Sequence, residues 1–233
     1  MNSAELLTAP AEAACTAPDG SAETVSRLLA REHRLTLCVD GEAFALLVCT
    51  RDRLRELVLG RLCTAGRIAA ESDVRSLRFS EEEGRAEVTL RPGAGGGAVS
   101  ALTDRSGWRG EDIFRLAKHL RENMPLHDAT SGTHGAALLH RGEVLCCCED
   151  IGRHNAIDKA VGTALALGVP LDECVHYTTG RIAVDIARKA AAAGVPVLVS
   201  RTLPTAEAVQ CAASAGLTLI GRAWETQYEV FTR

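Results

Sequence analysis

The sequence predicts an α/β fold in which a mixed, mainly parallel sheet carries helices on both faces, together with a small N-terminal α+β subdomain. Two observations lead to this prediction. In the second half of the chain, short apolar runs typical of buried strands are followed three times by segments with helical periodicity. In the first half, Asp40-Gly41 separates two alternating apolar runs, which indicates a β-hairpin.

The N-terminal part of the chain divides into two segments. Residues 1–30 are rich in alanine, glutamate, serine and threonine with little apolar periodicity, so we expect a flexible segment, either a mobile tail or a loosely attached helix. The hairpin follows over residues 34–49 and opens a small α+β subdomain over residues 31–92. Its other predicted elements are a helix that Thr50 caps and Gly66 ends, and strands over residues 74–79 and 86–91.

Residues 93–110 begin with a glycine-rich run, GAGGG, that breaks the pattern on both sides. A phosphate-binding glycine loop would need a preceding strand and a following helix with a lysine or threonine at fixed spacing. The sequence lacks this pattern here, so we interpret the segment as a linker. The α/β core then spans residues 111–233. Its predicted helices cover residues 111–124, 155–167, 182–193 and 206–215, and its predicted strands cover residues 135–139, 144–148, 174–177, 195–199 and 217–220.

Composition argues against several classes of protein. The 233 residues carry a net charge of -4 without a clustered basic stripe, and only 3% are aromatic, which argues against a nucleic-acid surface. No apolar run approaches the ~20 residues of a membrane span, and the N-terminus lacks a secretory signal pattern, so we expect a cytoplasmic protein with no membrane partner. We interpret the nine cysteines as free thiols.

A ligand site is expected where the strands of the core end. In an open parallel sheet, the loops beyond the carboxyl ends of the strands and the N-termini of the helices share one edge. Hydroxyl and guanidinium groups at that edge are typical of phosphate binding. The alternative is that the hydroxyls only cap helices and the arginines are solvated. The candidates are Thr178, Thr179, Ser200, Thr202, Thr205, Arg153, Arg181, Arg201 and Arg222.

The stretch from Cys146 to Lys159, CCCEDIGRHNAIDK, concentrates ionisable groups between a strand and a helix. Catalysis is one interpretation, because His154 follows two carboxylates, Glu149 and Asp150. The other is structural: the carboxylates cap the helix and pair with Arg153 and Lys159. The residues alone favour the structural interpretation slightly.

The three consecutive cysteines are a poor metal site, because adjacent residues of a strand point to opposite faces. Core packing is the simpler interpretation for Cys146 and Cys147. Cys148 borders the loop, so we expect it to be the most exposed of the three. Arg153 and the following helix N-terminus would lower its pKa and favour a nucleophilic thiolate.

The chain resembles the formate dehydrogenase accessory sulfurtransferase family (FdhD/NarQ) over about residues 32–233. The resemblance lies in LTLCVDGEAFALLVCTRDRLRELVLGRLCTAGRI, SGTHGAALL, EDIGRHNAIDKAVG, the stretch from TTGRIAVD to LTLIG, and the tail VFT. It implies a cytidine-deaminase-like core without the deaminase zinc site, usually in a homodimer.

The resemblance also implies a function. Such proteins move sulfur from a cysteine desulfurase to the molybdenum bis-guanine-dinucleotide cofactor before a molybdenum-dependent formate dehydrogenase receives it, and GDP would mimic part of that cofactor. The family's C-x-x-C loop, whose first cysteine carries the persulfide, is missing here, since no cysteine lies between Cys63 and Cys146. Its cofactor-binding tail aligns with residues 222–227, where the chemistry differs.

The sequence therefore predicts a cofactor-binding accessory protein in which sulfur transfer is either lost or moved to another thiol, with Cys148 as the candidate. The alternative is a binding chaperone without covalent chemistry. The predicted cofactor-binding residues are His134, Asp150, Arg153, His154, Asn155, Lys159, Thr179, Arg181, Ser200, Thr205, Arg222 and Gln227.

Overall fold

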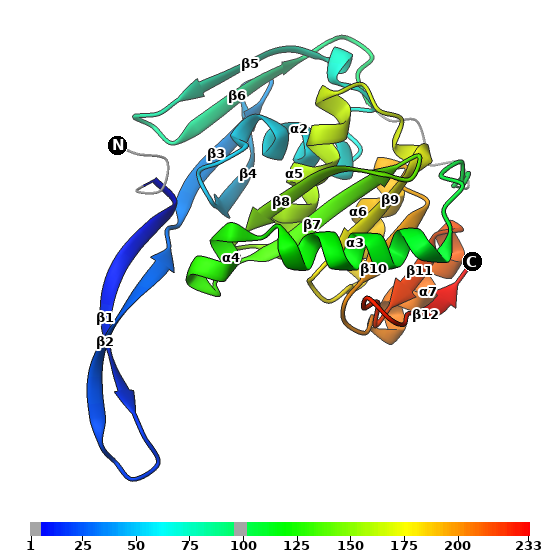
Figure 1. Cartoon of the computed structure of the whole chain (residues 1–233). Coiled ribbons are helices and arrows are strands. Elements are labelled where there is room, and N and C mark those ends of the chain that lie inside the picture. The colour runs from blue at the N-terminus through cyan, green and yellow to red at the C-terminus, as the bar shows by residue number, and fades with distance from the viewer. Residues whose placement is uncertain (1–5, 96–101) are drawn as a thin grey trace.

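The computed structural model describes residues 6–95 and 102–233. Its centre is a six-stranded sheet with the strand order β12-β11-β10-β9-β7-β8 (Figure 1). The predicted core strands are confirmed within a few residues, whereas the last strand was not predicted. The strands are β7 (His134–His140), β8 (Glu143–Asp150), β9 (Cys174–Thr178), β10 (Val197–Ser200), β11 (Thr218–Gly221) and β12 (Glu229–Thr232).

The sheet is mixed, as predicted, but it is not mainly parallel, because three of its five strand pairings are antiparallel. Strands β9, β10 and β11 pair in parallel, β7 is antiparallel to both β8 and β9, and β12 is antiparallel to β11. Strands β8 to β11 therefore run in one direction. The helices α6 (Val184–Ala193) and α7 (Ala206–Ala215) connect the parallel strands.

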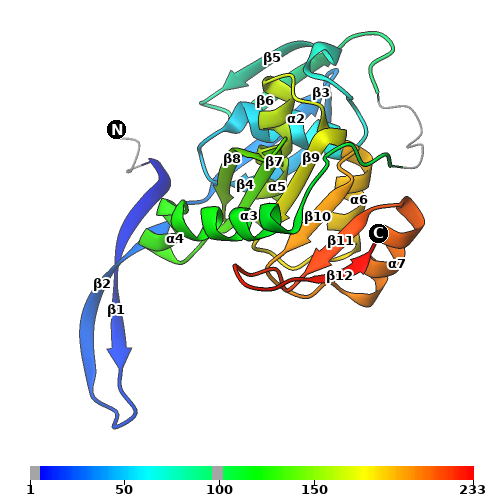
Figure 2. The same ribbon diagram turned by 45° about the vertical axis from the view of Figure 1, so that its right-hand side comes forward.

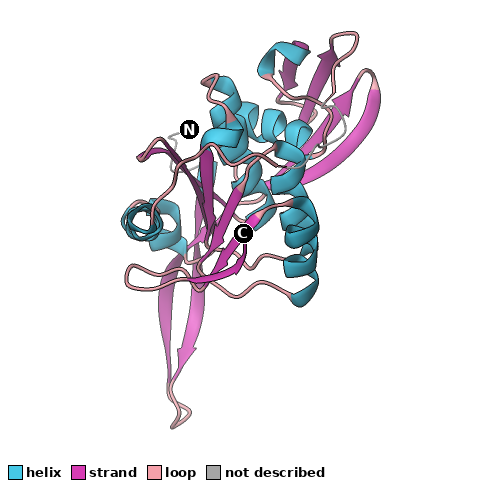
Figure 3. Cartoon of the chain, turned by 90° about the vertical axis from the view of Figure 1, so that its right-hand side faces the viewer, coloured by secondary structure: helices cyan, strands magenta, loops and turns pink. Residues whose placement is uncertain are grey.

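Helices cover both faces of this sheet (Figure 2). Side chains alternate along β7, so Ala136 and Leu138 face α5 (Arg153–Ala166), while Ala137 and Leu139 face α3 (Gly110–Glu122). Figure 3 shows the sheet between these two layers of helices. A short helix that was not predicted, α4 (Pro125–Thr130), follows α3.

A second sheet has the order β4-β3-β6-β5 and contains the predicted hairpin. The helix α2 (Leu54–Thr64) packs against α5, and the two helices belong to a core shared by both sheets. They approach so closely that a Cβ atom added at Gly60 or Gly162 would lie 1.7 or 1.8 Å from a carbonyl oxygen of the other helix. The strands of this second sheet are β3 (His33–Val39), β4 (Glu42–Cys49), β5 (Val74–Ser80) and β6 (Arg85–Leu90).

The structure corrects three local predictions. Thr50 does not cap α2, because Arg53, in the left-handed region, precedes the helix and Thr50 bonds to Asp150 instead. Strand β8 extends through Glu149 and Asp150, which were expected in a loop. Helix α5 begins at Arg153 rather than near Asn155, so Arg153 and His154 form its first turn.

Residues 8–30 form neither a mobile tail nor a helix but a hairpin that projects from the body (Figure 1). Strands β1 (Thr8–Thr16) and β2 (Ala22–Ala30) pair along their full length, with a turn at Asp19-Gly20. Alanine, which is depleted in strands, fills most apolar positions of β1, so composition concealed the alternation. We call this hairpin the arm.

The predicted linker lies partly outside the described residues. From residue 102 onward it runs along the core, where the backbone N–H of Arg105 donates to the carbonyl of Asp172 at 2.9 Å. Trp108 packs edge-on against Tyr228. Among the described helices, none is long and apolar enough to cross a membrane.

Candidate functional site

Four strands that run in one direction end at the same edge of the six-stranded sheet. Their last residues are Asp150, Thr178, Ser200 and Gly221. Strand β7 starts at this edge with His134, which pairs with Asp150 in the ladder. We call this edge and the loops that follow it the polar edge. The loops predicted to carry a ligand site are thus brought together.

The buried hydroxyls of the polar edge hold the loops in place. The Thr179 hydroxyl accepts a bond from the backbone N–H of Gly135 at 3.0 Å, and the Thr178 hydroxyl accepts one from the N–H of Gly180 at 3.1 Å. Ser200 donates to the carbonyl of Gly180 at 2.8 Å and accepts from the N–H of Thr202 at 3.0 Å. Thr179 and Ser200, two predicted ligand residues, therefore shape the site from within.

Other predicted residues lie further out on the loops. Thr205 caps α7 and accepts a bond from the N–H of Ala208, as the structural alternative expected. Arg181, Arg222 and Gln227 are exposed. Arg222 lies 3.5 Å from Glu229, so its charge is partly compensated.

Arg153 has an unpartnered donor. Its Nε is buried without a hydrogen-bond partner among the described residues, although buried polar groups are normally paired. The side chain lies against Gly180, where an added Cβ would come within 2.8 Å of Arg153 Cβ. Because Arg153 opens α5, its guanidinium and the positive end of the helix dipole occupy the same place. The unpaired donor and the positive end of the helix dipole both favour an anion at the start of α5.

Two histidines stand beside this guanidinium. Burial lowers the pKa of His134, and the nearby positive charges of Arg153, His127 and Arg201 add to the effect. The guanidinium groups of Arg153 and Arg201 thus lie near His134, although the chain as a whole has a net charge of -4. His154 bonds through Nε2 to Asp185 at 2.5 Å, which ties the start of α5 to α6.

A small cavity of about 50 Å³ opens between α3 and the loops that follow β9, β10 and β11. Trp224, 49% exposed, lines this cavity, and the guanidinium of Arg201 is 5.6 Å from the centre of the indole ring. Sequence analysis missed Trp224, although one of two tryptophans in a chain with few aromatics, placed after a strand, is a usable signal. The polar edge therefore offers an aromatic plane beside its cations.

Three predicted ligand residues are buried together with their partners. Lys159 is fully buried, and its Nζ lies 2.8 Å from Asp150 and 2.9 Å from Asp52. Asp150 also accepts bonds from the N–H of Thr50 at 3.0 Å and from Asn155 Nδ2 at 3.0 Å. This cluster joins β8 and α5 to the loop before α2. Asp150, Asn155 and Lys159 thus support the polar edge, and their polar atoms face one another.

The other carboxylates of the motif are also structural. Glu149 accepts bonds from the N–H groups of Leu126 and His127, at 2.9 and 2.7 Å, and so caps α4. Asp158 lies 2.6 Å from Lys189 Nζ, which joins α5 to α6. The structural interpretation of this motif accounts for most of its charges.

The exposure expected for Cys148 is wrong. Cys148 is only 1% exposed, because its side chain points with that of Cys146 towards α5. A hydrogen bond from Cys146 lowers the pKa of Cys148 against the effect of burial, yet no external reagent reaches this sulfur in the structure. Cys147 points to the opposite face and is half-buried, and burial raises its pKa to about 12. All nine cysteines are free thiols.

Within the described ranges, no group of three or more histidine, cysteine or acidic side chains is placed to hold a metal ion. The three cysteines fail as a chelate for the reason expected from the strand geometry, since Cys147 faces away from its neighbours.

Known proteins resemble this chain over most of its length. The FdhD/NarQ family model matches residues 30–233. The chain is 34% identical to the sulfur carrier protein FdhD of Geobacillus kaustophilus (strain HTA426), with 88% of each chain covered. It is 33% identical to the sulfur carrier protein FdhD of Halalkalibacterium halodurans, over 88% of this chain and 86% of the relative.

A solved structure shares the fold. The crystal structure of a protein from Desulfotalea psychrophila, described as a "putative formate dehydrogenase accessory protein", superposes with a TM-score of 0.86 at 25% identity and covers 97% of both chains. The match of the family model over most of the chain, the two relatives and the shared fold lead to one conclusion. The chain belongs to the FdhD/NarQ family.

Proposed function

We propose that this protein is an accessory protein of a molybdenum-dependent formate dehydrogenase. It binds the molybdenum bis-guanine-dinucleotide cofactor at the polar edge and assists its sulfuration, with a cysteine desulfurase as the sulfur donor. Membership of the family supports the accessory role, because relatives are named sulfur carrier proteins and the similar solved structure is described as an accessory protein.

The observation that carries the proposal is the unpartnered Nε of Arg153 at the start of α5. A buried guanidinium donor is costly to leave unpaired, and a phosphate oxygen satisfies it with a charge-assisted bond. The helix dipole favours the same ligand charge. The guanidinium of Arg201 adds positive charge close by, whereas burial and these cations lower the pKa of His134 and favour its neutral form. A ligand with several phosphates fits this edge.

The neighbouring aromatic plane supports a nucleotide rather than a simple anion. Exposed Trp224 and the guanidinium of Arg201 are surfaces on which a purine base stacks. Stacking is worth about 1–3 kcal/mol per base. The carboxylate of Glu225 lies beside Trp224 in the lining of the cavity, and both of its oxygens accept bonds from the guanidinium of Arg121. A guanine would have to share this carboxylate with Arg121.

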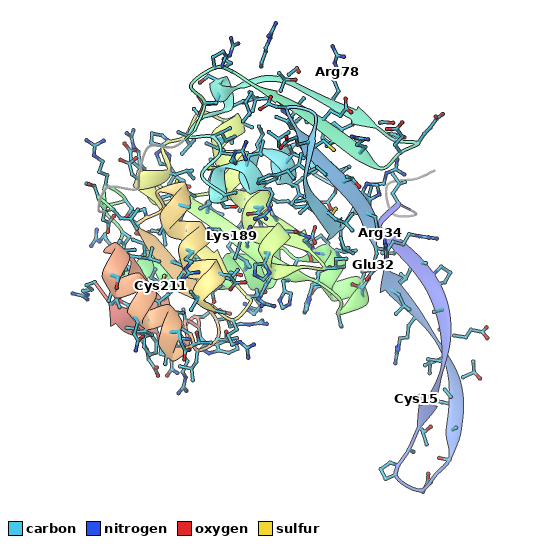
Figure 4. All side chains as sticks on the ribbon, turned by 180° about the vertical axis from the view of Figure 1, so that it is seen from behind. Cys15, Glu32, Arg34, Arg78, Lys189 and Cys211 are labelled. Carbon is cyan, nitrogen blue, oxygen red and sulfur yellow. The ribbon has the colours of Figure 1, made fainter. Side chains whose placement is uncertain are left out.

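GDP is the probe that tests this site. We expect Arg153→Met to weaken GDP binding at least about tenfold in isothermal titration calorimetry, because a charge-assisted bond worth about 1.5–3 kcal/mol is lost. The matched control is Arg78→Met, which removes an exposed arginine from β5 on the other side of the molecule and leaves binding unchanged (Figure 4). Equal affinity of wild type and Arg153→Met, or no binding of GDP by wild type, refutes the assignment.

A second candidate function, a binding chaperone without sulfur transfer, is favoured by the burial of Cys148, the thiol that the sequence predicts as the sulfur carrier. Sulfur transfer requires an accessible thiolate that attacks the outer sulfur of the desulfurase persulfide, so that the old S–S bond breaks and the desulfurase leaves as a thiolate. Cys15 on the arm is exposed and Cys211 on α7 is half-exposed (Figure 4), whereas Cys148 is buried.

Intact-mass analysis after treatment with a cysteine desulfurase and cysteine separates the two functions. The sulfur carrier is expected to gain about 32 Da per persulfide. The adduct should survive Cys148→Ser and disappear when Cys15, Cys147 and Cys211 are all replaced by serine, because only these three sulfurs reach the surface. Unmodified wild-type protein that still binds GDP leaves the chaperone function alone.

A further inference from the structure

A second cavity, of about 370 Å³, lies between β4 of the second sheet and the helices of the core. It is formed by residues 45–47 of β4, Arg61 in the last turn of α2, and the first turns of α5 and α6. Lys189, labelled in Figure 4, belongs to its lining. We call it the junction cavity. Its volume is in the range of about 300–1,000 Å³ that is typical of ligand sites, which often lie between two parts of a fold.

The two carboxylates of the junction cavity already have partners. Asp158 lies 2.6 Å from Lys189 Nζ, and Asp185 bonds to His154 Nε2 at 2.5 Å. Lys189 Nζ also donates to the Thr64 hydroxyl at 3.2 Å, so its donors are engaged within the chain. These side chains therefore satisfy one another and leave the recognition of a charged ligand to the remaining ionised group of the lining, which is Arg61.

Arg61 forms no ion pair with a carboxylate of the described residues. Its guanidinium lies 5.7 Å from the centre of the Phe44 ring, and the guanidinium of Arg67, which likewise has no carboxylate partner within the described ranges, lies 5.5 Å from the same centre. Contact with an aromatic face holds a guanidinium in place and leaves its N–H groups free. Two such groups on one ring favour an anion, and the fork of donors on Arg61 matches a carboxylate.

The β4 wall of the junction cavity is apolar. It consists of Ala45, Leu46 and Leu47, and Leu46 is 60% exposed. Covering an exposed leucine with another apolar group removes both surfaces from water and is favourable. Strand β4 is also the edge strand of its sheet, so its outer backbone groups have no strand partner in the described part of the chain. The wall therefore suits an aliphatic group close to the anion.

We propose that the junction cavity binds a carboxylate with a short aliphatic body. The carboxylate pairs with Arg61, and the aliphatic group packs on Leu46. His154 supplies a further polar contact, because Asp185 engages its Nε2 while its Nδ1 has no partner among the described residues. Two sources have this chemistry: a free aliphatic acid, and the C-terminal residue of a partner protein, whose backbone can also bond to the edge of β4. The site is separate from the polar edge.

Two probes distinguish these sources in NMR titrations of the full, isotopically labelled chain. Isovalerate represents the free acid, and we expect it to shift the amide signals of Leu46 and Leu47 with a dissociation constant below about 10 mM. Acetate should bind at least about tenfold more weakly, because it lacks the branched group that covers Leu46. The peptide acetyl-Gly-Gly-Leu represents a chain end. Tighter binding of this peptide than of isovalerate identifies a chain end as the ligand, and weaker binding identifies a free acid.

Substitutions test the two contacts separately. Arg61→Met is expected to weaken the binding of isovalerate at least about tenfold, because the charge-assisted bonds are lost. The matched control is Arg188→Met, which removes an exposed arginine of α6 outside the lining and leaves binding unchanged. Leu46→Ser should bring the affinity for isovalerate to within about threefold of that for acetate.

Three results overturn the proposal. The first is a wild-type protein that binds neither isovalerate nor the peptide, and the second is equal binding of the better ligand by wild type and Arg61→Met. The third is equal binding of the peptide and its C-terminal amide, which lacks the carboxylate. GDP should not displace isovalerate, because the two sites are separate; displacement would place the acid at the polar edge and also refute the junction cavity as its site.

Discussion

Replacing Lys159 with methionine is expected to lower the free energy of unfolding by about 3–5 kcal/mol. The ammonium group is fully buried and lies 2.8 Å from Asp150, 2.9 Å from Asp52 and 2.6 Å from the Thr50 hydroxyl. Burial disfavours its charge, but the two carboxylates outweigh this effect and raise the pKa of Lys159. Methionine matches the length of the side chain, yet it leaves the carboxylate of Asp150 buried without its cation.

Urea denaturation at pH 7 measures this effect. Adding Asp150→Asn to Lys159→Met should recover part of the loss, because the uncompensated charge is then removed. Lys118→Met, on the exposed side of α3, is the matched control and should change stability by less than about 0.5 kcal/mol. A Lys159→Met protein as stable as wild type contradicts the structural role assigned to the cluster.

This cluster changes what the motif EDIGRHNAIDK means. The sequence shows several charges close together, and two of the predicted ligand residues, Asp150 and Lys159, are chosen on that basis. It does not show that Thr50 and Asp52, about a hundred positions earlier, fold onto them. Partners that are distant in sequence decide whether a charge faces a ligand or another side chain. Within this motif, the buried Nε of Arg153 has no hydrogen-bond partner among the residues that the structure describes.

Local patterns were enough for much of the fold. The Asp40-Gly41 turn and the helical stripe at residues 111–124 depend on neighbouring residues, and both elements are present. The exposure predicted for Cys148 is wrong, because alternation along a strand shows which residues share a face but not which face a helix covers. The arm was missed because alternating alanines carry little strand preference. For Cys148 the missing information is therefore tertiary, whereas for the arm it is a local signal that alanine makes weak.

Acid is expected to destabilise the protein through His176. This side chain is fully buried, neither ring nitrogen has a hydrogen-bond partner among the described residues, and burial lowers its pKa from 6.5 to about 4. The unfolded chain therefore binds a proton at a higher pH than the folded chain. The stability that depends on neutral His176 is fully present above pH 6.5 and is lost as the pH falls towards 4, to a total of about 3 kcal/mol.

The comparison with His176→Leu isolates this group, because other titrating groups contribute equally to both proteins. We expect the stability of wild type relative to the variant to fall by about 2 kcal/mol between pH 7.5 and pH 5, as measured by urea denaturation. At pH 7.5 the variant should be at least as stable as wild type, since leucine removes two unpaired polar atoms from the core. If the stabilities of wild type and His176→Leu change in parallel with pH, the imidazole is hydrated or paired in solution, and its burial on β9 is incomplete.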